Sequence, residues 1–325
     1  MSVDLRCGDA LALLREMPDK CVQTCVTSPP YWGLRDYGVA GQLGLERTPE
    51  EYVAHMVEVF REVRRVLRDD GTLWLNLGDS YCATPNSWTG WDSSTLTMPH
   101  GRPRSIQIAQ MASIRGGREF PNLKPKDLVG IPWRVAFALQ ADGWWLRSDI
   151  IWHKPNPMPE SVTDRPTKSH EYLFLLSKSA RYYYDVDAIR EPHIHADDPR
   201  NDGRRHTYAY DAKHNQVDPD RQRTKTDCVS FHPNGRNARS VWTITTRPYR
   251  EAHFATFPPE MPRRCILAGS KPGDTVLDPF AGAGTTGLVA DRLGRNFVGF
   301  DINPAYVEMA RQRIANDAPL FAEGA

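Results

Sequence analysis

The segment DTVLDPFAGAGTTGLVADRLGRNFVGFD, residues 274–301, contains the pattern that decides the fold. It opens with a β-rich run over 274–278, continues through a glycine-containing turn, and reaches a helical pattern over 285–293. A second β-rich run over 296–301 and a helical pattern over 304–314 follow. This order predicts a strand–turn–helix–strand–helix unit, the building block of sheets with parallel strands.

The turn within this unit has the chemistry of a ligand site. Gly282 and Gly284 permit a tight turn and close approach of the backbone to a ligand, and the helix N-terminus beyond them favours a carboxylate or phosphate. Asp301 ends the next strand, where an acidic side chain can accept hydrogen bonds from ribose hydroxyls. With Gly287 the spacing also matches the dinucleotide fingerprint, so a nicotinamide (NAD)-dependent oxidoreductase is an alternative interpretation. Only 47 residues follow Asp278, so the remaining strands of the sheet must come from earlier in the chain.

That earlier part of the chain contains alternating strand and helix patterns. Thr48–Glu51 form a capping box with Pro at the first helical position, and the helix predicted after it runs through Leu67 and stops at Asp70-Gly71. The other predicted elements are strands over 22–26, 72–77, 145–152 and 172–176 and a helix from about 127 to 141. The alternation predicts an α/β fold with a mostly parallel sheet and helices on both faces.

A second motif, Thr27-Ser-Pro-Pro-Tyr-Trp32, follows the strand predicted over 22–26, at the edge where α/β sheets bind their ligands. The two consecutive prolines fix the backbone and leave carbonyl groups as acceptors. Together with the Ser28 hydroxyl, they predict a rigid acceptor site for an amino group. Tyr31 and Trp32 offer aromatic faces on which a planar heterocycle can stack.

Composition and charge exclude several classes of protein. The 325 residues include 41 Lys and Arg against 40 Asp and Glu, and 40% are hydrophobic, as in ordinary globular proteins. No stretch approaches the ~18 apolar residues of a membrane span, and the first residues lack the apolar region of a signal peptide. The six cysteines are scattered, without a CxxC pair, as is typical of reduced thiols. We therefore expect neither a membrane protein nor a secreted or disordered one, but a cytoplasmic enzyme.

The two motifs together resemble the S-adenosylmethionine-dependent amino methyltransferases of DNA, in the β class, where the Ser/Asp-Pro-Pro-Tyr motif comes first and the cofactor motif last. The resemblance covers most of the chain and includes five further segments: GDA (8–10), IWHKPNPM (151–158), SHEYLF (169–174), FATFPPE (254–260) and GFDINP (299–304). It implies a seven-stranded, mostly parallel, Rossmann-like methyltransferase sheet with helices on both faces. It also implies an inserted, irregular, basic target-recognition region.

The resemblance further implies S-adenosylmethionine as cofactor and a role for individual residues. Asp9 would lie near the adenine, Asp301 on the ribose, and Thr256, Phe257 and Pro258 would close the other side. The methionine part would be held by Asp278, Phe280, Gly282, Gly284, Thr285 and Thr286. The implied catalytic residues, which would receive a base flipped out of the duplex, are Ser28, Pro29, Pro30 and Tyr31. Trp152 and Lys154 would contact the pocket or the DNA backbone.

The implied reaction methylates an exocyclic amino group, whose lone pair is delocalised into the base. Acceptors at Ser28 and the Pro29 carbonyl would align that lone pair with the methyl group, without a covalent intermediate. In the family, Ser at the first motif position mostly accompanies methylation of cytosine at N4, whereas Asp or Asn accompanies adenine N6. We therefore expect N4-cytosine, with N6-adenine as the alternative. A carbon-5 cytosine enzyme needs an attacking thiolate, usually in a Pro-Cys dipeptide, and the sequence has none. A catalytically idle DNA-binding protein and methylation of RNA or a protein amide stay open.

The resemblance also divides the chain into regions: a catalytic half (1–80), a basic insertion (81–126), a continuation of the sheet (127–185), a target-recognition region (186–250) and a cofactor half (251–325). Two stretches are basic, with a net charge of +5 over 99–126 and +4 over 190–250, which favours double-stranded DNA as partner. The insertion is expected to clamp DNA or to form a dimer contact. Candidates for guanine edges or phosphates are Arg204, Arg205, Arg221, Arg223, Arg236 and Arg239.

The remaining expectations concern protein partners and metals. A homodimer and a cognate restriction endonuclease are the protein partners that the resemblance allows. The region 190–250 contains five histidines and Cys228, but their spacings do not match those of metal sites, so no metal is predicted.

Overall fold

A computed structural model describes residues 1–34, 36–82, 122–193, 234–246 and 257–317 of the chain. The chain divides into two compact units. The first comprises Met1–Tyr184 and Ser240–Ala325, and the second comprises Asp185–Arg239.

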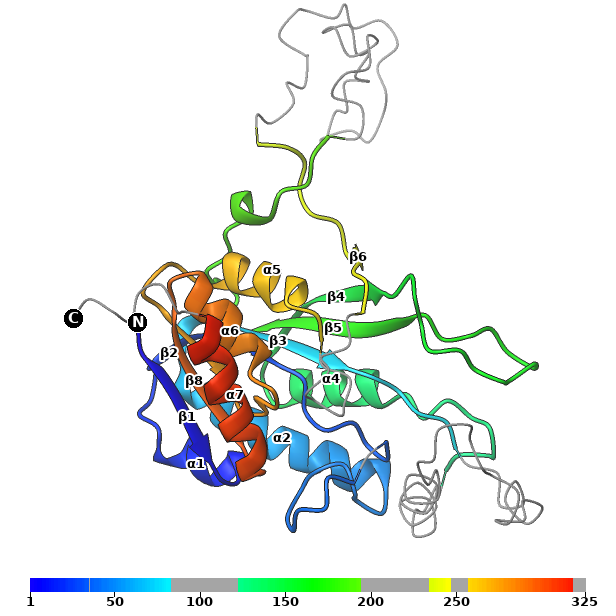
Figure 1. Cartoon of the computed structure of the whole chain (residues 1–325). Helices are drawn as coiled ribbons and strands as arrows, with labels where there is room; N and C mark the ends of the chain where they lie inside the picture. Colours follow the sequence, from blue (N-terminus) through cyan, green and yellow to red (C-terminus); the bar gives the residue numbers. More distant parts are fainter. Residues whose placement is uncertain (35, 83–121, 194–233, 247–256, 318–325) are drawn as a thin grey trace, which may run out of the picture. The chain divides into compact units, whose positions relative to one another are not determined.

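The first unit is built on an eight-stranded sheet with the order β1-β8-β7-β2-β3-β5-β4-β6 (Figure 1). Its strands are β1 (Val3–Cys7), β2 (Val22–Thr27), β3 (Leu67–Leu77), β4 (Trp145–His153), β5 (His170–Ser177), β6 (Val241–Thr243), β7 (Thr275–Asp278) and β8 (Asn296–Asp301). Neighbouring strands pair in parallel except around β5, which is antiparallel to both β3 and β4. The predicted α/β class with a mostly parallel sheet is confirmed.

The strand count differs from the seven expected, because β6 adds a short eighth strand. Its three residues pair in parallel with Ile151–His153 of β4. Trp242 at its centre is buried and packs against Trp74 of β3, with ring centroids 6.3 Å apart. A strand of three residues is too short for its periodicity to be recognised in the sequence, so tertiary packing decides it.

Helices cover both faces of the sheet, as predicted (Figure 1). The helices are α1 (Ala10–Glu16), α2 (Pro49–Val66), α4 (Ile131–Ala141), α5 (Glu260–Gly269), α6 (Thr285–Arg292) and α7 (Pro304–Asp317). α2 packs against α1 and α4 in one layer, whereas α6 packs against α5 and α7 in the other. Met56, Phe60 and Val63 of α2 are wholly buried, which shows that the apolar spacing marks the face toward the sheet.

The predicted end of α2 is wrong by a few residues. The helix begins as expected, with the Thr48 side chain accepting from the Glu51 amide in a capping box, but it ends at Val66. Leu67 has an extended backbone, is wholly buried and pairs with Val22, so β3 begins there rather than at Thr72. Pairing and burial of Leu67 outweigh the helical pattern that continues through it.

The predicted start of α4 also moves, from about residue 127 to Ile131. Gly130 precedes the helix with φ 78°, and no side chain of the local sequence caps it. Instead, Asp79, which follows β3, accepts from the amides of Gly130 and Ile131, both at 3.0 Å. The cap of α4 thus comes from the end of a strand about 50 residues earlier in the chain.

The second unit is described over residues 185–193 and 234–239, which overlap the region 186–250 defined from the sequence. Asp187–Ile189 form a short 3-10 helix, and Glu191 and Arg236 are joined by a pair of backbone hydrogen bonds of 2.9 and 2.8 Å. Most of the other basic stretch, 99–126, lies outside the described residues. None of the helices in the described ranges is long and apolar enough to cross a membrane.

Candidate active site

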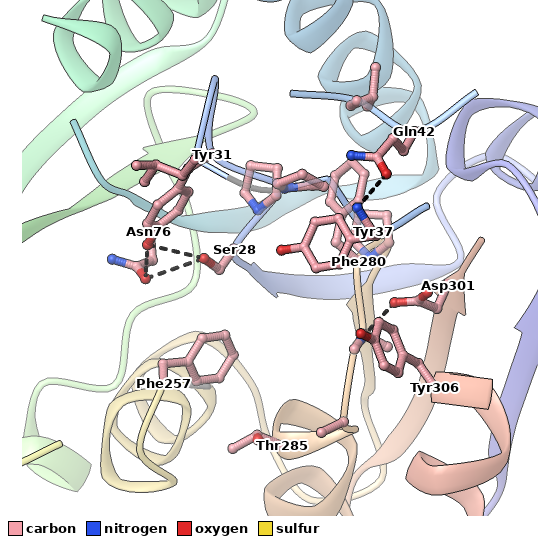
Figure 2. Close-up of a pocket in the computed structure, with 18 of the residues that line it drawn as sticks. Ser28, Tyr31, Tyr37, Gln42, Asn76, Phe257, Phe280, Thr285, Asp301 and Tyr306 are labelled. Atoms are coloured by element: carbon pink, nitrogen blue, oxygen red, sulfur yellow. Dashed lines mark hydrogen bonds between the residues drawn. The ribbon is translucent and has the colours of Figure 1, made fainter. Parts of the chain in front are cut away.

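One cavity of about 860 Å³ lies at the carboxyl edge of the sheet and is lined by both sequence motifs. Strands β1, β8, β7 and β2 are consecutive parallel neighbours, so the residues that follow them meet at one edge. Asp9 follows β1, Ser28 follows β2, Phe280 follows β7, and Asp301 ends β8; all four line the cavity. Figure 2 shows Ser28 and Tyr31 at one side of it and Phe280, Asp301 and Tyr306 at the other.

The glycine turn after β7 has the conformation that its sequence predicts. Gly282 and Gly284 have φ values of 51° and 73°, in the left-handed region that favours glycine. At Gly284 a Cβ atom would also lie 2.7 Å from the Cβ of Ala310 in α7, so a side chain is excluded there by packing. At Gly282 no atom lies within 4 Å of that position, and the residue lines the cavity.

Asp301 holds this turn and faces the cavity. Its two carboxylate oxygens accept from the amide of Gly282 at 2.9 Å and from the amide of Asn303 at 2.8 Å. Burial raises the pKa of Asp301, and these two hydrogen bonds oppose the shift. A carboxylate oxygen accepts more than one hydrogen bond, so Asp301 retains acceptor capacity for hydroxyl groups of a ligand.

Asp278 lies beneath the cavity and does not line it. This carboxylate is 1% exposed and accepts from the Thr27 hydroxyl at 2.7 Å, the Thr286 hydroxyl at 2.6 Å and the Phe280 amide at 3.1 Å. Burial raises its pKa to about 6, against the lowering effect of these three hydrogen bonds. Asp278 therefore braces the glycine turn against β2 and α6, and Thr286 is part of that brace.

Of the remaining predicted cofactor residues, some line the cavity and others do not. Asp9 caps α1, accepting from the Ala12 amide at 2.9 Å, and lines the cavity. Phe257, Phe280 and Thr285 also line it, whereas Pro258 and Gly284 do not. Thr256 lies outside the described residues.

Tyr37, Gln42 and Tyr306 also line this side of the cavity, and the sequence interpretation did not include them. The Gln42 side chain accepts from the Tyr37 amide at 2.7 Å, and the Tyr37 and Tyr306 rings meet edge to face at 6.4 Å. Aromatic rings beside acidic groups suit a nucleoside whose base stacks and whose ribose donates hydrogen bonds. No local signal marks these residues, because they belong to a loop and to a helix whose pattern otherwise serves packing.

At the other side of the cavity, Ser28 and Tyr31 belong to a hydrogen-bonded group (Figure 2). The Ser28 hydroxyl donates to the Tyr31 oxygen at 3.3 Å or to the Asn76 amide oxygen at 3.4 Å. The Tyr31 hydroxyl donates to Glu171 at 2.7 Å or to Asn76 at 3.0 Å. Burial, followed by the charge of Glu171, raises the pKa of Tyr31 well above its ordinary value, so the phenol stays protonated.

Asn76 and Glu171 were not identified as site residues from the sequence. Asn76 interrupts the apolar strand Leu-Trp-Leu-Asn-Leu, and its side-chain nitrogen donates to the Tyr172 carbonyl at 3.0 Å, which turns its oxygen toward the hydroxyls. Glu171 is the second residue of β5 and forms a short ion pair with Lys154. A polar residue inside an apolar strand is the one signal that could have drawn attention to Asn76.

Trp152 and Lys154 also line the cavity, with the Lys154 ammonium 4.3 Å from the centre of the Trp152 ring. The indole nitrogen of Trp152 donates to the Ile244 carbonyl at 2.9 Å, which fixes the ring in the cavity wall. Lys154 is placed against Glu171 and Trp152, at the same side of the cavity as Tyr31.

Two expectations about the Ser-Pro-Pro-Tyr segment need correction. Trp32 offers no stacking face, because it is 1% exposed and its indole nitrogen donates to the Glu46 carbonyl at 3.0 Å. The Pro30 carbonyl accepts from the Tyr52 hydroxyl at 2.9 Å and so ties the segment to α2. Ser28, Pro29, Pro30 and Tyr31 all line the cavity.

Of the six candidate arginines, Arg236 and Arg239 lie in the described part of the second unit. Both approach Glu191, at 2.9 and 3.4 Å respectively. Arg204, Arg205, Arg221 and Arg223 lie outside the described residues, as do Cys228 and all but His193 of the histidines noted there. Over the part of the chain that the structure describes, no group of three His, Cys, Asp or Glu side chains is placed to hold a metal ion.

One cavity at the carboxyl edge of this α/β sheet therefore joins aromatic rings and carboxylates to a cluster of hydrogen-bond acceptors, as expected of an enzyme that brings two ligands together. Comparison with known proteins gives the family: a family model described as DNA methylase (N6_N4_Mtase) matches residues 22–312. The chain belongs to this family of DNA methylases. Its cofactor is S-adenosylmethionine. This finding excludes the alternative interpretation of the glycine turn, a nicotinamide-dependent oxidoreductase.

Relatives with curated names agree with this family. The type II methyltransferase M.Cfr9I of Citrobacter freundii is 46% identical over 310 residues, which cover 95% of this chain and 87% of that one. M.SmaI of Serratia marcescens, also a type II methyltransferase, is 46% identical over 94% of this chain and 89% of its own length.

Two solved structures are also similar to this chain. One is the putative DNA modification methylase TTHA0409 of Thermus thermophilus in complex with S-adenosylmethionine. It has a TM-score of 0.58 and 25% identity, and the match covers 98% of this chain and 95% of that one. The other is the cytosine-N4-specific PvuII DNA methyltransferase, which has a TM-score of 0.60 and 18% identity and covers 98% and 91% of the two chains. At 18% identity, the likeness to the PvuII enzyme shows that the two proteins share a fold.

The lining residues have the chemistry that S-adenosylmethionine requires. The rings of Phe280 and Tyr306 suit stacking against an aromatic group, the carboxylate of Asp301 suits hydrogen bonds from ribose hydroxyls, and Gly282 leaves free space beside the backbone. Phe257 and Thr285 complete the wall on which the predicted cofactor residues converge. The carboxylates of Asp301 and Asp9 also suit a ligand with a positively charged sulfur.

Proposed function

We propose that this enzyme methylates the exocyclic N4 amino group of cytosine, in a base flipped out of double-stranded DNA. One observation carries the proposal: the acceptors of Ser28 and Asn76 line the same cavity as the cofactor side chains. The proposal includes base flipping because Ser28 and Tyr31 line the inside of the cavity, where an amino group that is still stacked in a duplex cannot reach them. The choice of cytosine rests on Ser28, the residue that mostly accompanies N4 methylation in the family that the motifs resemble.

The side chains of the cavity act by holding the flipped base and the cofactor in position. Tyr31, held by Glu171 and Asn76, presents its ring at the cavity wall for stacking against the flipped base. The Ser28 hydroxyl accepts a hydrogen bond from the amino group, which favours the geometry in which the nitrogen lone pair leaves the ring plane. When bound, S-adenosylmethionine supplies a methyl group on a positively charged sulfur. Asp278 and Asp301 fix the glycine turn on which that ligand lies.

The experiment that tests this function is nucleoside mass spectrometry of duplex DNA of varied sequence after incubation with the enzyme and S-adenosylmethionine. N4-methylcytosine is the expected product. N6-methyladenine would keep the fold and the cofactor but show that Ser28 does not select cytosine. The absence of any modified nucleoside, with cofactor binding intact, would favour a DNA-binding protein without activity or a substrate other than DNA.

The second unit and the basic insertion complete the proposal. We infer that residues 186–250 read the target sequence and that 81–126 clamp the DNA, because both stretches are basic. In the described part, Glu191 holds Arg236 and Arg239, which orients two guanidinium groups. A homodimer, a cognate restriction endonuclease and a cytoplasmic location stay predictions, and the proposed reaction depends on none of them.

A further inference from the structure

Three side chains of the cavity form a continuous hydrogen-bonded chain in which every donor points the same way. The Ser28 hydroxyl donates to the Tyr31 oxygen at 3.3 Å, and the Tyr31 hydroxyl donates to Glu171 Oε2 at 2.7 Å. The first hydroxyl is the group that meets the amino substrate, and the last group is a carboxylate. Such a chain can move a proton by one step at each member, without any side chain changing place.

The side chains that contact this hydrogen-bonded chain show why Glu171 is its terminal base. Asn76 accepts from both hydroxyls, at 3.4 and 3.0 Å, but its amide oxygen is a poor proton acceptor. Its side-chain nitrogen is committed to the Tyr172 carbonyl, so Asn76 aligns the two hydroxyls. Lys154 forms an ion pair with the other oxygen of Glu171, and its charge compensates the negative charge of this carboxylate inside the cavity.

After methylation, the amino nitrogen carries one proton more than the neutral product, and this proton has to leave. The amino nitrogen forms a bond to the methyl carbon while the carbon–sulfur bond breaks and its electron pair goes to sulfur. The nitrogen then carries the methyl group, both hydrogens and a positive charge, and a neutral product requires that one nitrogen–hydrogen bond break with its electrons staying on nitrogen.

The geometry points to Glu171 as the base that receives this proton, through Tyr31 and Ser28. The amino proton passes to Ser28 Oγ, the Ser28 proton to Tyr31 Oη, and the Tyr31 proton to Glu171 Oε2. One proton leaves the substrate and one reaches the carboxylate, so charge and atoms balance. This inference rests on the proposed function, since it takes an amino group at Ser28 as given. It adds a role for Glu171 that the sequence motifs do not assign.

The test is chemical rescue of a variant that lacks the carboxylate. In single-turnover reactions on duplex DNA, we expect Glu171→Ala to methylate about 10²-fold or more slowly than the natural enzyme, the usual scale for loss of a positioned base. Added formate, a carboxylate small enough for the vacated space, is expected to restore much of that rate. Tyr31→Phe interrupts the chain, so formate is expected to leave the Tyr31→Phe/Glu171→Ala double variant as slow as Tyr31→Phe alone.

A matched control and two readouts other than activity accompany this test. Glu160 lies in the connection between β4 and β5, is paired with Arg165 at 2.6 Å and is absent from the cavity lining, so Glu160→Gln is expected to keep its rate. Binding of S-adenosylhomocysteine and of DNA by Glu171→Ala is expected to stay within about threefold of normal, a difference of less than 1 kcal/mol. In the resting protein, the ¹³Cζ resonance of Tyr31 is expected to move in Glu171→Gln, because an amide replaces its carboxylate acceptor.

The outcomes separate the relay from the function on which it rests. A normal rate in Glu171→Ala, or a slow rate that formate does not restore, overturns the relay while N4-methylcytosine formation by the natural enzyme stands. Failure of the proposed function appears in the natural enzyme itself, which would then form no N4-methylcytosine. A slow variant restored by formate, with both binding constants unchanged, supports the relay.

Discussion

At the residue scale, the buried carboxylate of Asp278 connects the two motifs of the sequence. Its three hydrogen bonds reach Thr27 at the end of β2, Thr286 at the start of α6 and Phe280 in the cavity wall. Its pKa of about 6 lies above the value of about 3.9 for an unfolded chain. The folded protein therefore binds a proton more readily than the unfolded chain between these two values, so this group makes the fold more stable as the pH falls from 7 to about 4.

The matching prediction concerns Asp278→Asn, which has no titrating group at this site. From pH 7 to pH 4.5, the raised pKa of Asp278 adds about 2 kcal/mol to the free energy of unfolding of the natural protein. The variant is expected to lack this contribution, whereas contributions of other groups are shared and cancel. Urea unfolding of both proteins at the two pH values measures the difference. An equal response to pH in both proteins would contradict the assignment.

A second prediction at this scale contrasts the two glycines of the turn. Gly284→Ala places a methyl group 2.7 Å from Ala310 at a φ of 73°, whereas Gly282→Ala meets no atom within 4 Å. Both changes bear the cost of a left-handed backbone, about 1 kcal/mol, and Gly284→Ala adds a steric clash of about 1 to 3 kcal/mol. Thermal unfolding is expected to place Gly284→Ala clearly below Gly282→Ala. The reverse order would show that α7 shifts to make room for the added methyl group without lowering the stability of the protein.

At the scale of elements, helix caps and strand ends explain which predictions from the sequence are confirmed and which are wrong. The capping box of α2 and the unit from β7 to α7 are local patterns, and their predictions are confirmed with small shifts at the ends. β1, α1, α5 and β6 were not predicted; β1 and β6 are the two edge strands of the sheet, and β6 and α1 are only three and seven residues long. The start of α4 depends on Asp79, a residue distant in sequence, and no local pattern reports such a cap.

The role of Asp79 as a distant cap leads to a prediction of stability. Asp79→Ala removes the acceptor of two amides at the start of α4 and is expected to lower the free energy of unfolding by about 1 to 2 kcal/mol. Thr48→Ala, which removes the local cap of α2, provides the comparison, with an expected loss of about 1 kcal/mol. Denaturant titrations measure both. A neutral effect of Asp79→Ala would mean that water caps α4 equally well.

At the scale of the whole molecule, the sheet of the first unit interleaves strands from both ends of the sequence. β2 lies between β3 and β7, and β1 pairs with β8, so the first 80 residues and the last 75 share one sheet. The sequence indicated this arrangement, because too few residues follow the glycine turn to complete a sheet alone. It did not indicate Asn76 and Glu171 as site residues, since their roles arise from pairing of β3 with β5 beside Tyr31.

This interleaving predicts that the first unit unfolds as a whole. Denaturation followed by far-ultraviolet circular dichroism and by loss of S-adenosylhomocysteine binding is expected to give coincident midpoints. For the same reason, the isolated segment 251–325, which contains the whole glycine turn, is expected not to bind that ligand. Binding by the segment alone would show that the cofactor site forms without β1 and β2.

The bond between Thr27 and Asp278 has a consequence for inheritance. The two residues stand 251 positions apart, yet they share one hydrogen bond of 2.7 Å beneath the cavity. Recombination that exchanges one end of the gene with that of a distant relative unites a Thr27 and an Asp278 of different ancestry. Selection then acts on the pair as one trait, so we expect viable hybrid genes to be those whose parents carry compatible partners at both positions.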